Sequence, residues 1–294
     1  MHPAPSRPDD PPPPGGLTGR RRAAVGEALR EEGAKGALVA FASTVAFFGL
    51  AAWAVAASPN WPAVQHQFFN PERFAEAWPD VVGGFWLDLQ MFAYAMAAIP
   101  VLALAVAVLR SFRGPAFFPL KLLSVVYIDL FRGIPLILLI LLLGFGAPAL
   151  DIGGLPRSPI FWGLSALTLS YSAYTAEIYR SGIDAVPESQ RSSARALGLT
   201  QWQTLRFAVL PQAVRNVIPA LLNTVVSLQK DVALVSILGV REAVREAQIY
   251  TSRTFNYTSY VAATVLFLAI SIPLARFADW YSARDRARRS QSVA

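Results

Sequence analysis

The sequence predicts an all-α integral membrane protein. Of its 294 residues, 54% are hydrophobic and 15% are charged, whereas soluble globular proteins carry about 25% charged residues. Several apolar runs reach the roughly 20 residues that a helix needs to cross a bilayer. The net charge of +7 could indicate nucleic-acid binding in a soluble protein. In this composition it fits the Lys and Arg excess of cytoplasmic loops better, so we expect a lipid bilayer and no nucleic acid as partner.

Six apolar segments are long enough to be membrane spans, and polar or basic stretches separate them. The predicted spans are 36–57, 89–109, 122–150, 159–176, 216–240 and 254–275. The third is long for one crossing, and we expect Gly133 and Pro135 to bend it near its start.

The segments outside the spans predict the topology. We expect a disordered cytoplasmic tail at 1–35, where prolines and charges dominate, a first transmembrane helix at 36–58, and a Trp- and Pro-rich extracytoplasmic loop at 59–84. A basic cytoplasmic tail is expected at 281–294. Twenty of the 26 Lys and Arg residues fall in tails and loops that six crossings place on one side, and five fall opposite. This bias predicts a multi-pass cell-membrane protein with both termini in the cytoplasm.

The composition excludes several kinds of chemistry. The chain has no cysteine, so disulfides, thiolate catalysis and zinc–cysteine sites are excluded. Its two histidines, His2 and His66, do not suggest a metal site. None of the three lysines, Lys35, Lys121 and Lys230, follows a glycine, so the chain has no Walker A phosphate loop. A membrane enzyme is therefore disfavoured, and we expect no catalytic or metal-binding residues.

The segment 187–212 predicts two short helices joined at a glycine corner. Pro187 and Glu188 suit a helix start, and Gly198 stands where a left-handed C-terminal cap is needed. Thr200 and Gln203 form a capping box that starts the second helix. One face of this helix is apolar and carries Trp202, Leu205 and Val209. The helix is expected to end at Pro211. A fixed shape of this kind suits docking into another protein, although an amphipathic hairpin on the membrane surface is an alternative.

This segment resembles the EAA loop of the permease subunits of ABC importers. Ser192-Ser193-Ala194, Gly198, Ala208 and Leu210-Pro211 follow the spacing of that motif, with serines in place of the glutamate and the first alanine. Three further stretches, 130–135, 172–183 and 229–240, resemble the polar amino acid branch of these permeases. The resemblance covers about residues 85–280.

The resemblance implies a type I ABC importer permease fold, with a five-helix core at 85–280 and the first span as an additional helix. It implies a permease subunit that translocates a polar amino acid or a similar zwitterion. The implied partners are a second permease subunit, identical or related, an ABC ATPase dimer that binds ATP and magnesium, and an extracytoplasmic substrate-binding protein. This chain would hold no cofactor. The residues that match the ATPase-coupling segment are Ser192, Ser193, Ala194, Gly198, Trp202, Leu205, Leu210 and Pro211.

A stand-alone secondary transporter or channel for a small polar solute is the competing hypothesis. It would need no docking segment, and an internal repeat typical of many such proteins is not apparent in the sequence.

Charged residues within the predicted spans are candidates for function because charge is costly in a bilayer. Two pairs spaced three residues apart can each meet on one helix face near the interface: Asp129 with Arg132, and Glu177 with Arg180. Lys230 and Asp231 lie deeper, where an unpaired charge costs about 2.5–3.5 kcal/mol. Adjacent residues point about 100° apart on a helix, so these two are poor partners for each other. Either they form interhelical salt bridges, or they line a translocation pathway together with Glu177.

Overall fold

The computed structural model describes the backbone of residues 19–112 and 114–291, and all regular elements in these ranges are helical. These described residues divide into two units, one that ends at residue 63 and one that begins at residue 64, and each is considered separately.

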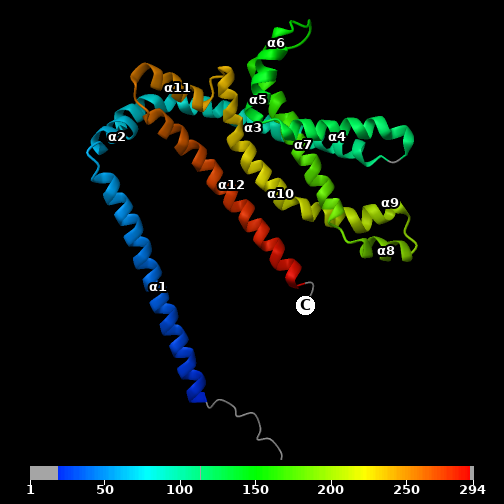
Figure 1. The fold of residues 1–294 in the computed structure, drawn as a ribbon, viewed down its shortest axis with the longest axis horizontal. Helices are drawn as coiled ribbons and strands as arrows, with labels where there is room; N and C mark the ends of the chain where they lie inside the picture. The colour runs from blue at the N-terminus through cyan, green and yellow to red at the C-terminus, as the bar shows by residue number, and fades with distance from the viewer. Residues whose placement is uncertain (1–18, 113, 292–294) are drawn as a thin grey trace, which may run out of the picture. The chain divides into compact units, whose positions relative to one another are not determined.

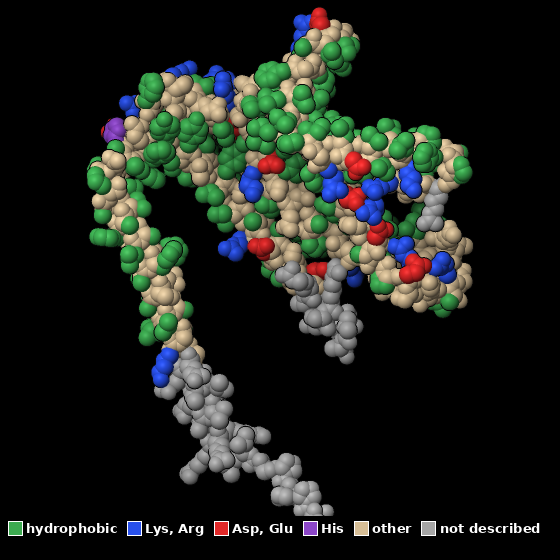
Figure 2. Space-filling model, in the orientation of Figure 1, with side chains coloured by type: hydrophobic (Ala, Val, Ile, Leu, Met, Phe, Trp, Pro, Cys, Tyr) green, Lys and Arg blue, Asp and Glu red, His purple; other side chains and the backbone are tan. Residues whose placement is uncertain are grey.

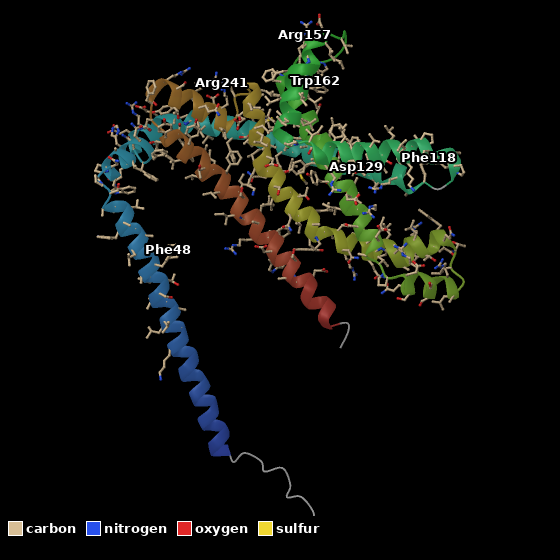
Figure 3. The ribbon with its side chains drawn as sticks, viewed as in Figure 1. Phe48, Phe118, Asp129, Arg157, Trp162 and Arg241 are labelled. Atoms are coloured by element: carbon tan, nitrogen blue, oxygen red, sulfur yellow. The ribbon has the colours of Figure 1, made fainter. Side chains whose placement is uncertain are left out.

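The first unit contains a long helix, α1 (Gly19–Ala56). Its stretch Lys35–Ala56 is long and apolar enough to span a membrane, and its large apolar side chains, such as Phe48 (Figure 3), are exposed. The predicted disorder of 1–35 is wrong for residues 19–35, which are helical. No proline occurs in this stretch, and its Ala, Arg and Glu residues are strong helix formers. Residues 1–18 lie outside the described part of the chain.

The expected loop at 59–84 is also largely helical. It contains α2 (Trp61–Phe68) and the start of α3 (Pro71–Ser111), a helix of 41 residues. The Asn70 side chain caps α3 by accepting hydrogen bonds from the backbone N–H groups of Glu72 and Arg73, and Pro71 occupies the first turn. Asn-Pro-Glu is thus a helix start signal, which outweighs the Trp- and Pro-rich composition that favoured a loop.

The third predicted span is divided into two parts. A 3₁₀ turn, η1 (Pro115–Phe117), precedes helix α4 (Phe118–Gly133). The next helix, α5 (Leu136–Leu141), leaves the end of α4 at an angle of 105°. The π-helical η2 (Leu142–Gly146) and short α6 (Ala147–Ala149) continue α5. The expected bend at Gly133 and Pro135 is confirmed, but a single helix over 122–150 is wrong, because proline cannot donate the hydrogen bond that would continue α4.

Helix α7 (Pro159–Asp184) contains the fourth predicted span, 159–176, and packs against α3, α4 and α10. In its first turn, the Trp162 indole donates a hydrogen bond to the Pro156 carbonyl at 2.8 Å, which closes the preceding loop that carries Arg157 (Figure 3). Among the described helices, four and the bent α4–α5 pair have the length and hydropathy of a span. Helix α7 is not one of them, because Ser, Thr and Tyr lower its hydropathy. The fold class is confirmed as all-helical and membrane-spanning, but the count of six spans is not.

After α7 come α8 (Glu188–Ala196) and α9 (Gln201–Gln203). The expected break at Pro211 is wrong: α9 continues through the π-helical η3 (Thr204–Val209) into α10 (Leu210–Asp231) and the 3₁₀ segment η4 (Val232–Leu238). The wider π turn just before Pro211 accommodates a residue that has no N–H to donate. Figure 1 shows α8 and α9 as a hairpin at one end of α10, with α11 (Ala243–Thr254) beyond its other end.

The last helix, α12 (Thr258–Gln291), begins four residues after the predicted start of the sixth span. Phe255, with a φ of 55°, ends α11 first. Helix α12 also runs through most of the expected tail at 281–294, whose last three residues lie outside the described part.

The core of this unit lies where α3, α5, α7, α10 and η4 meet. Its buried residues include Met91, Ile140, Leu167, Leu228 and Val235. A second cluster, rich in alanine, joins α3, α11 and α12. Both clusters hold the elements that carry the site residues in fixed positions.

Candidate functional site

A cavity of about 760 Å³ opens where the break after α4 faces α7 and α10. We call it the polar cavity. The polar and charged residues that line it are Arg132, Ser170, Tyr171, Tyr174, Glu177, Ser181, Asn223, Thr224, Ser227 and Asp231. The 105° bend between α4 and α5 places Arg132 and the backbone of 133–136 in its wall. Three separate elements therefore contribute polar groups to one space.

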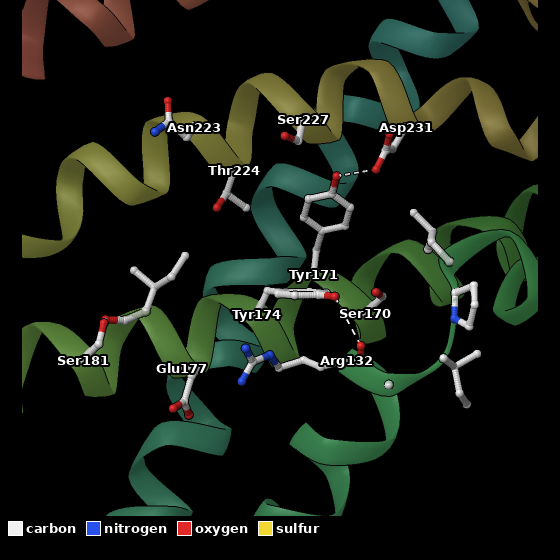
Figure 4. Close-up of a pocket in the computed structure, with 15 residues that line it drawn as sticks. Arg132, Ser170, Tyr171, Tyr174, Glu177, Ser181, Asn223, Thr224, Ser227 and Asp231 are labelled. Carbon is white, nitrogen blue, oxygen red and sulfur yellow. Dashed lines mark hydrogen bonds between the residues drawn. The ribbon is translucent and has the colours of Figure 1, made fainter.

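Two tyrosines of α7 organise the charged groups of the polar cavity (Figure 4). The Tyr171 hydroxyl donates a hydrogen bond to Asp231 Oδ2 at 2.7 Å, and the Tyr174 hydroxyl donates to the Arg132 carbonyl at 3.3 Å. The Arg132 guanidinium lies over the Tyr174 ring, 5.3 Å from its centroid. The cavity thus presents a carboxylate and a guanidinium, each held by an aromatic residue of the same helix.

Glu177 also lines the polar cavity and is bound by two arginines. Arg180 Nε donates to its carboxylate at 3.0 Å, and Arg110 of α3 donates at 2.7 Å. These guanidinium groups, that of Arg180 foremost, hold the pKa of Glu177 below its ordinary value. The expected pair of Glu177 and Arg180 is confirmed. Asp129 and Arg132, both described, form no ion pair with each other.

Lys230 and Asp231 face different spaces. Asp231 lines the polar cavity, whereas Lys230 is exposed in a separate, mostly apolar groove between α10 and α12 that includes Val226, Tyr260 and Phe267. The structure therefore brings together Glu177 and Asp231 but not Lys230. Because Lys230 and Asp231 are adjacent on a helix, the sequence had already predicted that their side chains would point in different directions.

The sequence interpretation missed the polar side chains that α10 contributes. Asn223, Ser227 and Asp231 recur every four residues, and Thr224 lies beside Asn223. This spacing places them on one helix face, so a search for polar periodicity within the apolar fifth span would have found them. Ser170, Tyr171 and Tyr174, from the Ser- and Tyr-rich stretch of α7, also line the cavity.

The second candidate site is the hairpin of α8, α9 and η3, which we call the hairpin. Its corner is as expected: Gly198 has a φ of 84°, and the N–H of Leu199 donates to the Ala194 carbonyl at 3.2 Å. The Thr200 N–H donates to Gln203 Oε1 at 2.9 Å, and the Gln203 N–H donates back to Thr200 Oγ1 at 3.3 Å. The predicted glycine cap and capping box are confirmed.

The surface of the hairpin combines apolar and charged side chains. Leu197, Trp202 and Phe207 are 82%, 66% and 64% exposed. Of the predicted coupling residues, Ala194 is buried and the others are exposed: Ser192, Ser193, Gly198, Trp202, Leu205, Leu210 and Pro211. Acidic and basic side chains gather around the hairpin and the adjoining end of α7 (Figure 2). Within α8, Arg195 donates to Glu188 at 2.7 Å. Exposed aromatic groups rimmed by charges are typical of a protein interaction site.

Comparisons with known proteins agree with this architecture. Residues 116–286, more than half of the chain, match the family model described as "Binding-protein-dependent transport system inner membrane component". The chain belongs to this family. Its members are membrane-spanning transport subunits, and a separate ATPase hydrolyses ATP, so the chain is not itself an enzyme. Family membership places it among multi-pass proteins of the inner membrane with ATPase and binding-protein partners, and favours the ABC importer hypothesis over a stand-alone transporter or channel.

Individual relatives are consistent with this assignment. The probable amino-acid ABC transporter permease YckA of Bacillus subtilis is 33% identical over 204 residues, which cover 69% of this chain and 87% of the relative. The arginine transport system permease ArtQ of Bacillus subtilis is 30% identical and covers 66% of this chain and 87% of its own length. A crystal structure of an amino acid ABC transporter with histidines aligns with a TM-score of 0.64 at 30% identity, over 70% of this chain and 94% of that one. The MetNI methionine transporter shares the fold, with a TM-score of 0.55 at 20% identity.

Proposed function

We propose that the chain is the translocating subunit of an ATP-driven importer for a polar amino acid or a similar small zwitterion. The observation that carries the proposal is the polar cavity, in which Asp231 and Arg132 present opposite charges within one space. An ammonium group of the substrate would bind Asp231, and its carboxylate would bind Arg132, since guanidinium and carboxylate groups match in geometry. Arg132 takes the place that the sequence interpretation gave to Lys230. The names of the relatives support an amino acid substrate.

The hairpin supplies the proposed contact with the ATPase. In this proposal Trp202, Leu205 and neighbouring exposed side chains enter a cleft of the ATPase on the cytoplasmic side. The extracytoplasmic binding protein delivers the substrate to the opposite side, and a second permease subunit completes the pore. The exposed aromatic surface of the hairpin supports this role.

Reconstituted transport tests the proposal. The chain would be purified with its ATPase, placed in proteoliposomes with the binding protein, and assayed for uptake of radiolabelled amino acids. Asp231→Asn removes a charge-assisted hydrogen bond worth about 1.5–3 kcal/mol, so we expect uptake to fall roughly ten- to a hundredfold. Complex assembly should be unchanged.

Lys230→Met is the matched control because Lys230 adjoins Asp231 but faces the other groove. We expect it to keep most of the uptake. Normal uptake by Asp231→Asn would exclude the substrate contact. A chain that purifies without any ATPase would exclude the importer function itself.

A further inference from the structure

Two carboxyl groups are buried side by side where α3 meets the start of α11. Asp88 is 1% exposed and Glu242 is fully buried. The two backbones come very close here, because a Cβ atom on Gly84 would lie 2.5 Å from the carbonyl carbon of Glu242. Neither carboxyl group lines the polar cavity or lies in the hairpin. The proposed transport mechanism therefore does not account for them.

Glu242 uses both carboxylate oxygens to cap α11. Its Oε2 accepts from the Val244 N–H at 2.9 Å, and its Oε1 accepts from the Arg245 N–H at 2.6 Å. The N-terminus of a helix favours an anion, so this arrangement stabilises Glu242 as a carboxylate. A proton on either capping oxygen would weaken the cap.

Asp88 has one oxygen satisfied and one without a partner. Its Oδ2 accepts a hydrogen bond from the Ala243 N–H at 3.2 Å. Its Oδ1 is buried and has no hydrogen-bond partner among the described residues. Asp88 and Glu242 accept hydrogen bonds from successive N–H groups, those of residues 243 to 245, so the two carboxyl groups lie together at the start of α11. Two ionised carboxylates are both acceptors and cannot bond to each other. A proton on Asp88 converts this contact into a hydrogen bond.

Nearby cations do not neutralise the two carboxyl groups. Arg241 binds Glu246 at 2.7 and 3.1 Å and has Asp80 of α3 as a further neighbour. The Arg245 side chain donates to Gln248. Farther along α3 and α11, Tyr250 bonds to Glu76, which pairs with Arg73. Residues 232–238 of η4 and the 262–270 part of α12 carry no charge.

Lys230 lines the neighbouring groove beside Val244, and none of the ion pairs between described residues joins it to Asp88 or Glu242. Two buried like charges in contact are unfavourable. Burial raises the pKa of Glu242, which is consistent with a pair that retains a proton.

We propose that Asp88 and Glu242 form a binding site for a single proton. Asp88 carries the proton and donates it to Glu242, which remains ionised as the cap of α11. The proton thereby fastens the start of α11 to α3. When it is lost, two carboxylates oppose each other and the contact between the helices loosens.

Infrared spectroscopy of the full-length protein in lipid nanodiscs tests where the proton is. At neutral pH we expect the wild type to show the carbonyl stretch of a protonated carboxyl group, and this band should shift in D₂O. The band should be absent from the spectrum of Asp88→Asn. Glu246→Gln is the matched control, since Glu246 is another carboxyl of α11 that is paired with Arg241, and it should keep the band. A wild-type spectrum without the band, or an Asp88→Asn spectrum that retains it, would overturn the proposal.

Thermal unfolding against pH gives a second readout that is independent of transport. Above about pH 4 the unfolded state has lost the Asp88 proton and the native state has kept it. Wild-type stability should therefore fall relative to Asp88→Asn as pH rises, by about tenfold in the unfolding equilibrium per pH unit, until the native pair deprotonates. Parallel pH curves for the two proteins would contradict a bound proton.

The two carboxyl groups should also respond differently to amidation. Asparagine at 88 can donate to Glu242 and accept from the Ala243 N–H, as a protonated aspartic acid does, so Asp88→Asn should unfold at nearly the wild-type temperature near pH 4 and above the wild-type temperature at neutral pH. Glutamine at 242 would turn an amide N–H toward a backbone N–H of the cap, so Glu242→Gln should unfold at a lower temperature. Asp88→Leu, which removes both hydrogen bonds, should also be less stable. If Asp88→Asn is as unstable as Asp88→Leu, the proton is not on Asp88.

Discussion

At Gly182, helix α7 packs tightly against α10. A Cβ atom there would overlap the Val217 side chain and lie 3.0 Å from the Ala213 carbonyl oxygen. Val217 and Ala213 are both buried, so neither can move aside freely. The absence of a side chain at 182 therefore allows the two helices that line the polar cavity to cross at this distance.

Gly182→Ala should consequently destabilise the protein. Overpacking of this kind costs about 1–3 kcal/mol, and the thermal unfolding temperature of the purified chain measures it. Gly83→Ala is the control, because Gly83 is also helical and a Cβ atom added there would meet no neighbouring atom within 4 Å. Equal unfolding temperatures for the two variants would show that the crossing tolerates a methyl group.

At the level of elements, the hairpin depends on one left-handed residue. Gly198 adopts a φ of 84° and has open space around its Cα, so only the backbone conformation restricts its replacement. A β-branched residue resists this conformation, and the left-handed region costs non-glycine residues about 1–2 kcal/mol.

Gly198→Val should therefore distort the hairpin and lower binding-protein-stimulated ATPase activity and uptake, while the protein still reaches the membrane. Gly198→Asn is the matched control, since asparagine tolerates this region better, and it should keep more activity. Membrane fractionation, ATPase assays and uptake measure the three effects. If the valine variant transports at the wild-type rate, the corner is not needed for coupling.

Local signals in the sequence predicted the elements that local chemistry determines. The glycine corner, the capping box and the bend at Pro135 each depend on a few neighbouring residues, and all three are confirmed. The start of α3 was missed although Asn70 and Pro71 signal it, because three further prolines and two tryptophans in 59–84 favoured a loop. The continuation of the helix through Pro211 was missed because the π turn that accommodates this proline has no clear signal in the sequence.

The polar cavity could be predicted only in part, because distant residues form it. The charge at Asp231 was identified from its position in an apolar segment, but its partner Tyr171 lies 60 residues away. Arg132 lies in the wall of the polar cavity because α5 leaves α4 at a sharp angle. The sequence does not specify the direction of that bend. The burial of Asp88 and Glu242 likewise depends on the packing of α3 against α11.

At the level of the whole molecule, the distribution of basic residues predicts the orientation in the membrane. Tags at Asp10 and Gln291 should both be inaccessible to impermeant reagents added outside intact cells, and a tag near Gln65 should be accessible. Permeabilised cells provide the control, because every tag should react there. A terminal tag that reacts in intact cells would contradict the predicted topology.

The unbroken helical path from Gln201 to Asp231 also has a mechanical consequence. The path is about 45 Å long, with the second arm of the hairpin at one end and the Asp231 carboxylate at the other. The tight crossing at Gly182 contacts this path at Val217, near its midpoint. A displacement of the hairpin would therefore be carried along one continuous helix, past a packed crossing, to the polar cavity that Asp231 lines.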